Sequence, residues 1–343
     1  MTVRSLRSLG VLVVAACVVA ACVLAASGSR AQGVEETTLA VPAISLTFSS
    51  TFLAEELRLW EKEGLRVRIS IVPGVGATNA VLSGSVDFGL GGGATLVRAA
   101  ARGQQLFAIA QLMDRMTQEA VLRKDLGEKA GITPTTPITK RAQALRGTRI
   151  AVDGVNTINH HVLKYLARKG GLDAEKDVTV TPMQPPNMIA ALKSGAIDGF
   201  VMSVPWPVMV SRDGTAITLA SAPRGDLPEL SPYPLIQVLT RPGFCDAKAS
   251  LCRKMVAGYK RALSMIHDNP AEALATLRRK FDKTDADVLS ESFELARAAA
   301  SRTGIIPEAG LKRAIDFQLE VGAMKPEEKV PSLAGLYTNK FVQ

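Results

Sequence analysis

The same stretch of chain occurs twice in this sequence, at positions 111 residues apart. Leu-Ala-Val at 39–41 reappears as Ile-Ala-Val at 150–152, and Ser-Gly-Ser-Val-Asp at 83–87 reappears as Ser-Gly-Ala-Ile-Asp at 194–198. Both matches have one offset (150 − 39 = 194 − 83 = 111), so no gap separates them. This register predicts two copies of one folding unit within the chain.

In each copy, short apolar runs alternate with segments of helical periodicity. Val67, Ile69 and Ile71, for example, alternate with polar residues, which is typical of a strand with one wetter face. Strands joined through helices form parallel sheets with right-handed crossovers. We therefore expect an α/β fold with mainly parallel sheets flanked by helices. Strands are expected at 38–41, 67–71, 86–90 and 106–110 in the first copy, and at 149–152, 178–180 and 197–202 in the second. Beyond residue 242 only helices are expected, at 248–267, 271–280, 285–301 and 308–321.

The repeat also predicts where a ligand would bind. In open parallel sheets, ligands bind outside the carboxyl ends of the strands, at the connecting loops. The offset pairs loop 43–49 with 154–160, loop 73–77 with 184–188, and loop 91–95 with 202–206, so two facing lobes would line one cleft. The candidate ligand-binding residues in these loops are small, polar or aromatic: Ser45, Thr47, Gly74, Gly76, Gly92, Gly93, Asn156, Thr157, Asn187, Ser203 and Trp206.

These six loops contain no Asp, Glu, Lys or Arg. Glycines let backbone N–H groups approach a ligand, and helix N-termini add unpaired N–H groups. Such a cleft suits a small anion or a neutral polar molecule and gives a cation no partner. Each residue also has a structural interpretation: the glycines as plain turn geometry, Ser45 and Thr47 as helix caps, and Trp206 as a packed side chain.

No motif for catalysis or for a cofactor is found in the sequence. The adjacent histidines His160 and His161 have no Cys or carboxylate at the spacing of metal ligands, so no metal site is expected. His160 is expected to line the cleft as a polar residue. Asp87 and Asp198 are matched between the copies and are expected to brace them. Binding without catalysis is therefore favoured. The alternative is an enzyme on the same scaffold that acts on a pyrimidine or a ring carboxylate.

The N-terminus has the order of a secretory signal. Arg4 and Arg7 precede an apolar run at 9–26, and Ser-Arg-Ala at 29–31 offers a small-x-small cleavage site. We expect residues 1–31 to be a signal peptide. An uncleaved anchor, or a lipid on Cys22, remains an alternative. All three place the rest of the chain outside the inner membrane, in the periplasm.

The charge distribution and the cysteine content indicate which partners and which disulfide to expect. The chain has 41 Lys and Arg against 32 Asp and Glu, and its basic residues are scattered, so no nucleic-acid partner is expected. Without the signal, Cys245 and Cys252 are the remaining cysteines. In an oxidising compartment they are expected to form a disulfide between a helix and the strand before it, with two free thiols as the alternative.

Several motifs resemble the nitrate, sulfonate and taurine group of ABC-importer binding proteins, which also includes binders of thiamine pyrimidine precursors. They are Glu-Lys-Glu-Gly-Leu at 61–65, the stretch 82–89, Leu-Arg-Gly at 145–147, the stretch 192–198 and Pro-Trp at 205–206. The resemblance covers about residues 36–300. It implies a type II periplasmic-binding fold with a return to the first lobe near 233–240.

The resemblance implies an organisation and a set of partners. Lobe I would comprise residues 32–116 and 236–343, and lobe II residues 117–235. The partners would be a small-molecule ligand (a sulfonate, carboxylate or pyrimidine) and an ABC permease, and the chain would be a monomer. Val204 stands where the family commonly has an acidic residue, which weakens the case for an amine-bearing ligand such as taurine.

Overall fold

The structure is a computed structural model that describes residues 34–330 and 332–343. The predicted signal peptide and the alternative lipid site at Cys22 lie outside these residues. Glu36–Gln343 form one compact unit. No helix in the described ranges is long and apolar enough to cross a membrane.

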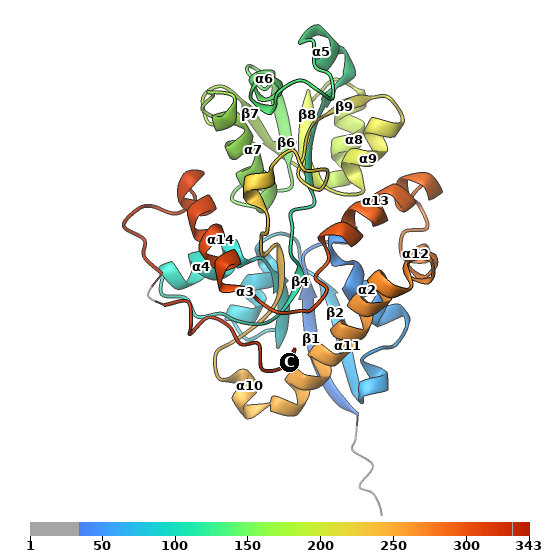
Figure 1. The fold of residues 1–343 in the computed structure, drawn as a ribbon, viewed down its shortest axis with the longest axis vertical. Coiled ribbons are helices and arrows are strands. Elements are labelled where there is room, and N and C mark those ends of the chain that lie inside the picture. The colour runs from blue at the N-terminus through green and yellow to red at the C-terminus, as the bar shows by residue number, and fades with distance from the viewer. Residues whose placement is uncertain (1–33, 331) are drawn as a thin grey trace, which may run out of the picture. The chain divides into compact units, whose positions relative to one another are not determined.

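Two five-stranded sheets have the same strand order (Figure 1). Sheet A has the order β2-β1-β3-β10-β4 and sheet B the order β7-β6-β8-β5-β9. The strands of sheet A are β1 (Glu35–Val41), β2 (Leu65–Ile71), β3 (Phe88–Gly91), β4 (Phe107–Met113) and β10 (Ile236–Thr240). Those of sheet B are β5 (Gln118–Arg123), β6 (Arg149–Val152), β7 (Thr179–Pro182), β8 (Gly199–Ser203) and β9 (Ala216–Ser221). The sequence repeat therefore extends to the topology of both sheets.

One strand in each sheet runs against its neighbours, which the alternating pattern of the sequence did not reveal. β10 is antiparallel to β3 and β4, and β5 is antiparallel to β8 and β9, whereas β1 and β3 are parallel, as are β6, β7 and β8. Each antiparallel strand is the first that the chain forms after it crosses from the other sheet. The chain thus passes from sheet A to sheet B after β4 and returns after β9, with β10 in the region expected for the return.

The helices of the two copies also correspond. The first copy contributes α2 (Ser49–Glu56), α3 (Gly76–Leu82) and α4 (Gly93–Ala101), and the second α7 (Ile158–Lys169), α8 (Pro185–Lys193) and α9 (Trp206–Arg212). Three short 3₁₀ turns are η1 (Leu46–Phe48), η2 (Glu61–Glu63) and η3 (Pro228–Leu230). The remaining helices are α5 (Lys124–Lys129), α6 (Ile138–Gln143), α10 (Phe244–Ala247), α11 (Ala249–Asp268), α12 (Pro270–Leu277), α13 (Ala286–Ala299) and α14 (Glu308–Glu320).

The repeated apolar triplets form the centre of each sheet. Residues 39–41 of β1 are fully buried, and their equivalents at 150–152 of β6 are at most 1% exposed. Parallel strands that are covered on both faces must be apolar along their whole length. This requirement explains why the triplet was visible as a sequence repeat.

The two matched aspartates form hydrogen bonds to equivalent positions of β1 and β6. The Asp87 carboxylate accepts hydrogen bonds from the Thr37 hydroxyl (2.8 Å) and the Thr38 backbone N–H (3.4 Å). The Asp198 carboxylate accepts from the Arg149 backbone N–H (2.9 Å) and from its guanidinium (2.9 and 2.7 Å). Thr38 and Arg149 occupy equivalent positions, so Asp198 pairs directly with a guanidinium at that position, whereas Asp87 has a longer ion pair with Arg241 (3.8 Å).

Cys245 and Cys252 are joined by a disulfide. The bridge connects α10 to α11, and not a helix to the preceding strand as the sequence suggested, because a short helix already begins at Phe244.

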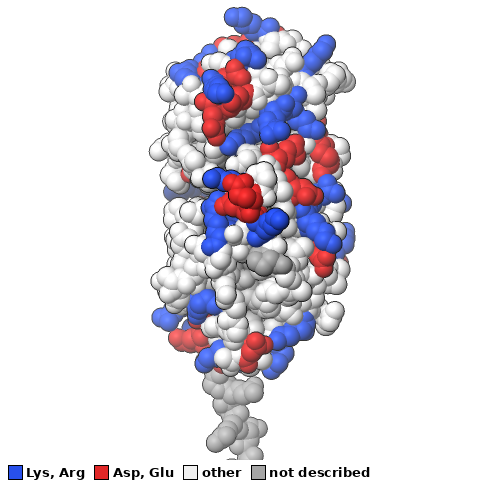
Figure 2. Space-filling model, turned by 90° about the vertical axis from the view of Figure 1, so that its left-hand side faces the viewer, with Lys and Arg blue, Asp and Glu red and all other residues white. Residues whose placement is uncertain are grey.

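Charged side chains of both signs are interspersed on the face drawn in Figure 2. Many form exposed pairs, such as Arg102 with Glu328 (3.0 Å) and Lys164 with Glu175 (2.9 Å). Mixed charges of this kind are typical of a solvated protein surface.

The matched aspartates give a test of stability. Hydrogen bonds from the Arg149 guanidinium lower the pKa of Asp198 below its ordinary value. Its stabilisation is therefore fully present above pH ~4 and is lost as the pH falls through the lowered pKa. We expect Asp198→Asn to reduce the free energy of unfolding by about 1–3 kcal/mol at neutral pH, and by less in acid. Urea unfolding measures both values. Asp87→Asn is the control with a smaller expected loss, and equal losses at neutral pH would contradict this interpretation.

Candidate functional site

A pocket of about 380 Å³ lies where turns of both sheets meet. This volume is in the usual range for small-molecule sites. Each of the six loops paired by the repeat contributes to the lining, including Ser45, Gly74 and Gly92 on the sheet A side and Asn156, Gln184 and Ser203 on the sheet B side. The pocket therefore lies at the carboxyl ends of the strands, as the repeat predicted.

Two hydrogen bonds join the sheet A and sheet B turns directly. The Ser45 Oγ lies 3.2 Å from the Ser203 Oγ and donates to the Val204 carbonyl at 3.0 Å. The same Ser45 Oγ accepts from the Thr47 backbone N–H, so this residue is also the N-cap of η1. The Thr47 hydroxyl lies 3.0 Å from that of Thr117, in the segment between the sheets. Both side chains thus combine a capping role with contacts across the pocket.

The structure brings together most of the residues that the sequence predicted as ligand contacts. Those in the pocket lining are Ser45, Thr47, Gly74, Gly92, Asn156, Thr157, Ser203 and Trp206. Three others are not in the lining, namely Gly76, Gly93 and Asn187. A ligand-binding role for any of them stays a prediction.

Packing and helix geometry explain these three exceptions. Gly93 is buried against Pro234, to whose carbonyl it donates a backbone hydrogen bond of 2.7 Å. A Cβ on Gly93 would come within 2.5 Å of the Pro234 ring, so this glycine serves close packing. Gly76 begins α3 beside Val72, and Asn187 is exposed on α8.

Arg98 is the main pocket residue that loop-based reasoning missed. It lies on α4 beyond the Gly-rich turn, and it lines the pocket together with Ala94 and Thr95, which precede it by four and three residues. That spacing places the three on one helix face, so a helical reading of 93–101 could have found it. Its Nη1 donates to the Asn156 carbonyl at 3.2 Å and lies 3.4 Å from the His161 Nε2.

Arg98 has no ion pair in the described part of the chain. Burial lowers the pKa of its guanidinium, and nearby Arg102 lowers it further. An arginine nevertheless remains charged in proteins. The pocket therefore contains a half-buried positive charge whose contacts are with a carbonyl and a neutral imidazole.

The second charged residue in the lining, Asp153, follows β6 and accepts a 2.7 Å hydrogen bond from the Thr157 hydroxyl. The expectation that a cation would find no partner was therefore wrong for the pocket as a whole. Both charges lie outside the six loops from which it was drawn.

His161, not His160, lines the pocket, so the prediction for His160 was wrong. The His160 Nδ1 accepts from the Asn156 backbone N–H at 3.1 Å and so supports the left-handed conformation of Asn156 (φ 63°). Burial lowers the pKa of His161 to about 3, with the Arg98 charge as the next cause. His161 is therefore neutral at physiological pH, and too weak a base for general base catalysis there.

No group of three or more His, Cys, Asp or Glu residues in the described ranges is arranged to hold a metal ion. The polar groups around the pocket are amides, hydroxyls, one imidazole, one indole N–H, one guanidinium and one carboxylate. Such a set is typical of ligand recognition by hydrogen bonds.

Gly92 gives a test of how tightly the turn is packed. A Cβ on Gly92 would lie 2.6 Å from the Leu235 carbonyl oxygen, so Gly92→Ala must displace backbone. We expect a loss of about 1–3 kcal/mol and a melting temperature lower by at least about 2 °C. In the control Gly154→Ala, the Cβ meets only the Thr157 methyl at 3.2 Å, and little change is expected. If both variants had the same melting temperature as the wild type, the close contact at Gly92 would not be a rigid feature.

Solved structures confirm the fold. A protein from Bordetella bronchiseptica RB50 matches with a TM-score of 0.76 and 21% identity, and the match covers 90% of this chain and 95% of that protein. The alkanesulfonate-binding protein SsuA from Xanthomonas axonopodis pv. citri, bound to MOPS, matches 90% of this chain and 100% of its own with a TM-score of 0.68 and 18% identity. The fold is the two-lobed periplasmic binding protein fold that the resemblance implied.

Sequence comparison adds a curated relative and a family. A bicarbonate transport ATP-binding protein, CmpC of Synechocystis, is 28% identical over 111 residues, which are 32% of this chain and 16% of that protein. The family model described as NMT1/THI5 like matches residues 46–273. Because that match spans most of the chain, including the pocket turns, the chain belongs to the NMT1/THI5-like family.

Proposed function

We propose that this chain is an exported solute-binding protein that captures a small organic anion in the periplasm and delivers it to an ABC importer. The observation that carries the proposal is the unpaired Arg98 guanidinium in a pocket between matched turns. The fold shared with an alkanesulfonate-binding protein and the expected signal peptide support the same role. The proposed lobes are residues 32–116 with 236–343, and 117–235.

The pocket chemistry favours an anion with an apolar body. A guanidinium binds carboxylates and sulfonates through charge-assisted hydrogen bonds. Much of the remaining wall is apolar, including Phe48, Leu90, Trp206 and Leu235. An anion would supply the charge that Arg98 lacks, and its body would replace water at these walls.

Closure of the two lobes would follow from contacts that join them. A bound molecule can favour the closed state only by its differential affinity for that state. Arg98 to Asn156 and Ser45 to Ser203 join the two sides at the pocket. A further group of contacts lies around Glu291 on α13.

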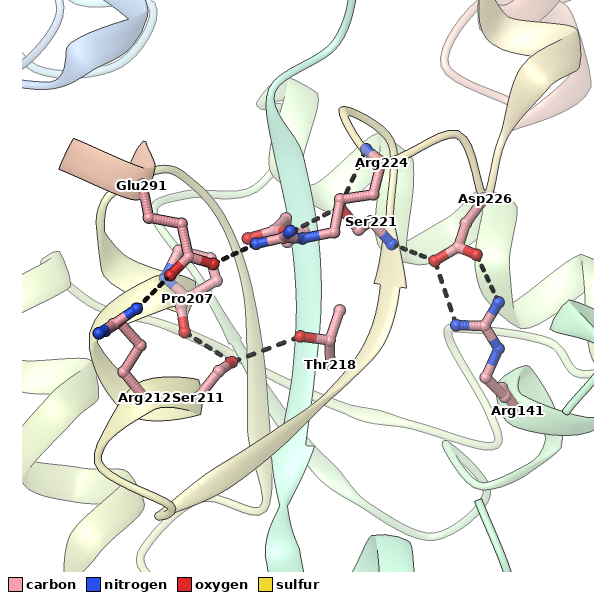
Figure 3. Close-up of polar contacts among 10 residues, drawn as sticks. Arg141, Pro207, Ser211, Arg212, Thr218, Ser221, Arg224, Asp226 and Glu291 are labelled. Atoms are coloured by element: carbon pink, nitrogen blue, oxygen red, sulfur yellow. Dashed lines mark hydrogen bonds and ion pairs between the residues drawn. The ribbon is translucent and has the colours of Figure 1, made fainter. Parts of the chain in front are cut away.

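Glu291 connects α13 to two segments associated with sheet B (Figure 3). Its carboxylate accepts from Arg212 on α9 at 2.8 Å and from Arg224, which follows β9, at 2.5 Å. Arg224 also lies 3.4 Å from the buried Glu119 of β5. We infer that this group, formed by Glu291, Arg212 and Arg224, stabilises the closed arrangement.

The enzyme alternative finds little support in the pocket. Its histidine, His161, has a pKa too low for proton transfer near neutral pH. Recovery of unaltered ligand after prolonged incubation would be expected of a binding protein.

Arg98→Gln tests the ligand class. We expect this variant to weaken binding of small carboxylates and sulfonates by about 10- to 100-fold, because a charge-assisted hydrogen bond contributes about 1.5–3 kcal/mol. Isothermal titration calorimetry measures the affinity. Arg102→Gln, at the C-cap of α4 and paired with Glu328, is the matched control with unchanged affinity expected. Equal affinities for wild type and Arg98→Gln would remove Arg98 from the site.

Glu291→Gln tests the closure mechanism. The two arginines it binds are each almost half exposed, so each ion pair contributes modestly, about 0.2–1 kcal/mol. We expect about two- to tenfold weaker ligand binding and a larger radius of gyration by small-angle X-ray scattering. Glu294→Gln, which removes a pair within α13 to Arg297, should change neither value. An unchanged affinity in Glu291→Gln would mean that these contacts do not distinguish open from closed states.

A further inference from the structure

Three buried side-chain oxygens in the pocket lining have no hydrogen-bond partner. One is the Tyr233 hydroxyl, and the other two are amide oxygens: the Oε1 of Gln118, at the start of β5, and the Oδ1 of Asn159, in the first turn of α7. Gln118 is 2% exposed and Asn159 is 3% exposed. Buried polar atoms are nearly always paired, and an unpaired one costs about 1–3 kcal/mol. The presence of such atoms in one ligand pocket therefore calls for a functional explanation.

Both side chains belong to one part of the pocket, which we call the pocket floor (Gln118, Asn159, Met202 and Ser203). Gln118 is the cross-strand partner of Ser203 in the β5–β8 ladder. The Asn159 Nδ2 donates to the Met202 sulfur at 3.4 Å, which leaves its Oδ1 free. The Ser203 hydroxyl is already engaged with Ser45. The floor therefore offers two amide oxygens as acceptors and has no net charge.

The positive charge comes from the opposite side of the pocket. Arg98 lies on α4, which follows β3 of sheet A, whereas Gln118 lies on β5 of sheet B and Asn159 on α7, which follows β6 of that sheet. Arg98 is half-buried and contacts the carbonyl of Asn156, which is exposed. The pocket thus combines a guanidinium from the sheet A side with neutral hydrogen-bond acceptors from the sheet B side.

We propose that the ligand is an organic anion whose compact apolar body carries a hydroxyl donor at the end remote from its charge. The carboxylate or sulfonate pairs with Arg98, and the donor satisfies Gln118 and Asn159. The body occupies the 380 Å³ between apolar walls that include Phe48, Trp206 and Leu235. This inference rests on the proposed function and specifies the class of ligand.

Two matched pairs of compounds test the inference by calorimetry on the mature protein. They are benzoate with 4-hydroxybenzoate, and benzenesulfonate with 4-hydroxybenzenesulfonate. The pairs differ in the head group, and the two members of each pair differ only in the hydroxyl donor, so the two effects are measured separately. We expect the hydroxylated member of at least one pair to bind about tenfold or more tightly than its partner. In Gln118→Leu that preference should fall several-fold.

Gln237→Leu is the matched control. Gln237 is also a buried glutamine with an unpartnered Oε1, but it lies on β10 and is not in the pocket lining. Its variant should keep the hydroxyl preference. Asn159→Leu gives a second test of the floor if Gln118→Leu does not fold.

The outcomes separate the two proposals. Equal binding within both pairs, with all affinities lost in Arg98→Gln, would overturn the donor inference and leave the anion proposal standing. A hydroxyl preference that persists in both floor variants would also overturn the inference. Absence of binding by all four anions at millimolar concentration would overturn both proposals.

Discussion

The pocket depends on the exchange of one strand between the two sheets. β10 enters sheet A between β3 and β4, and β5 enters sheet B between β8 and β9, and each is antiparallel to the strands beside it. An inserted strand cannot leave without breaking two ladders of hydrogen bonds. The segments that lead into these strands, next to Thr117 and Leu235, also form part of the pocket surroundings. The connections between the copies therefore position the turns that would hold a ligand.

The positive charge of Arg98 favours an anion as the molecule that this pocket binds. Taking the guanidinium of Arg98 out of water costs free energy that its carbonyl and imidazole contacts only partly offset. A neutral His161 adds no charge of its own. An anion that enters the pocket would supply the missing counter-charge in a low-dielectric site, where the attraction is stronger than in water. The same residue could thus contribute to both affinity and closure, since Arg98 reaches across to Asn156.

The sequence predicted those parts of this arrangement that recur in both copies at the offset of 111 residues. The buried triplets, the matched aspartates and the six paired turns all follow from one offset, because equivalent strands need equivalent residues. The antiparallel strands were not foreseen, since β5 and β10 interrupt the repeat and are related by no such offset. Arg98 was missed because it projects into the pocket from within a helix, whereas the predicted site consisted of loops.

Side-chain direction was the other limit of sequence reasoning. His160 and His161 are adjacent at a helix start, and only the packing of α7 decides which of them meets the pocket. Gly92 and Gly93 are likewise adjacent, yet Gly92 borders the pocket and Gly93 packs on Pro234. Asn187 follows the Pro-Pro pair that starts α8, and the rotation of that helix leaves it exposed. These choices depend on tertiary contacts that no local pattern encodes.

The most direct test of the account is affinity selection from a defined mixture of small carboxylates, sulfonates, neutral pyrimidines and amines, with mass spectrometry of what the folded protein retains. The account predicts that the wild-type protein retains carboxylates or sulfonates and that Arg98→Gln retains neither. Retention of only neutral molecules or amines, or of the same anions by both proteins, would contradict it.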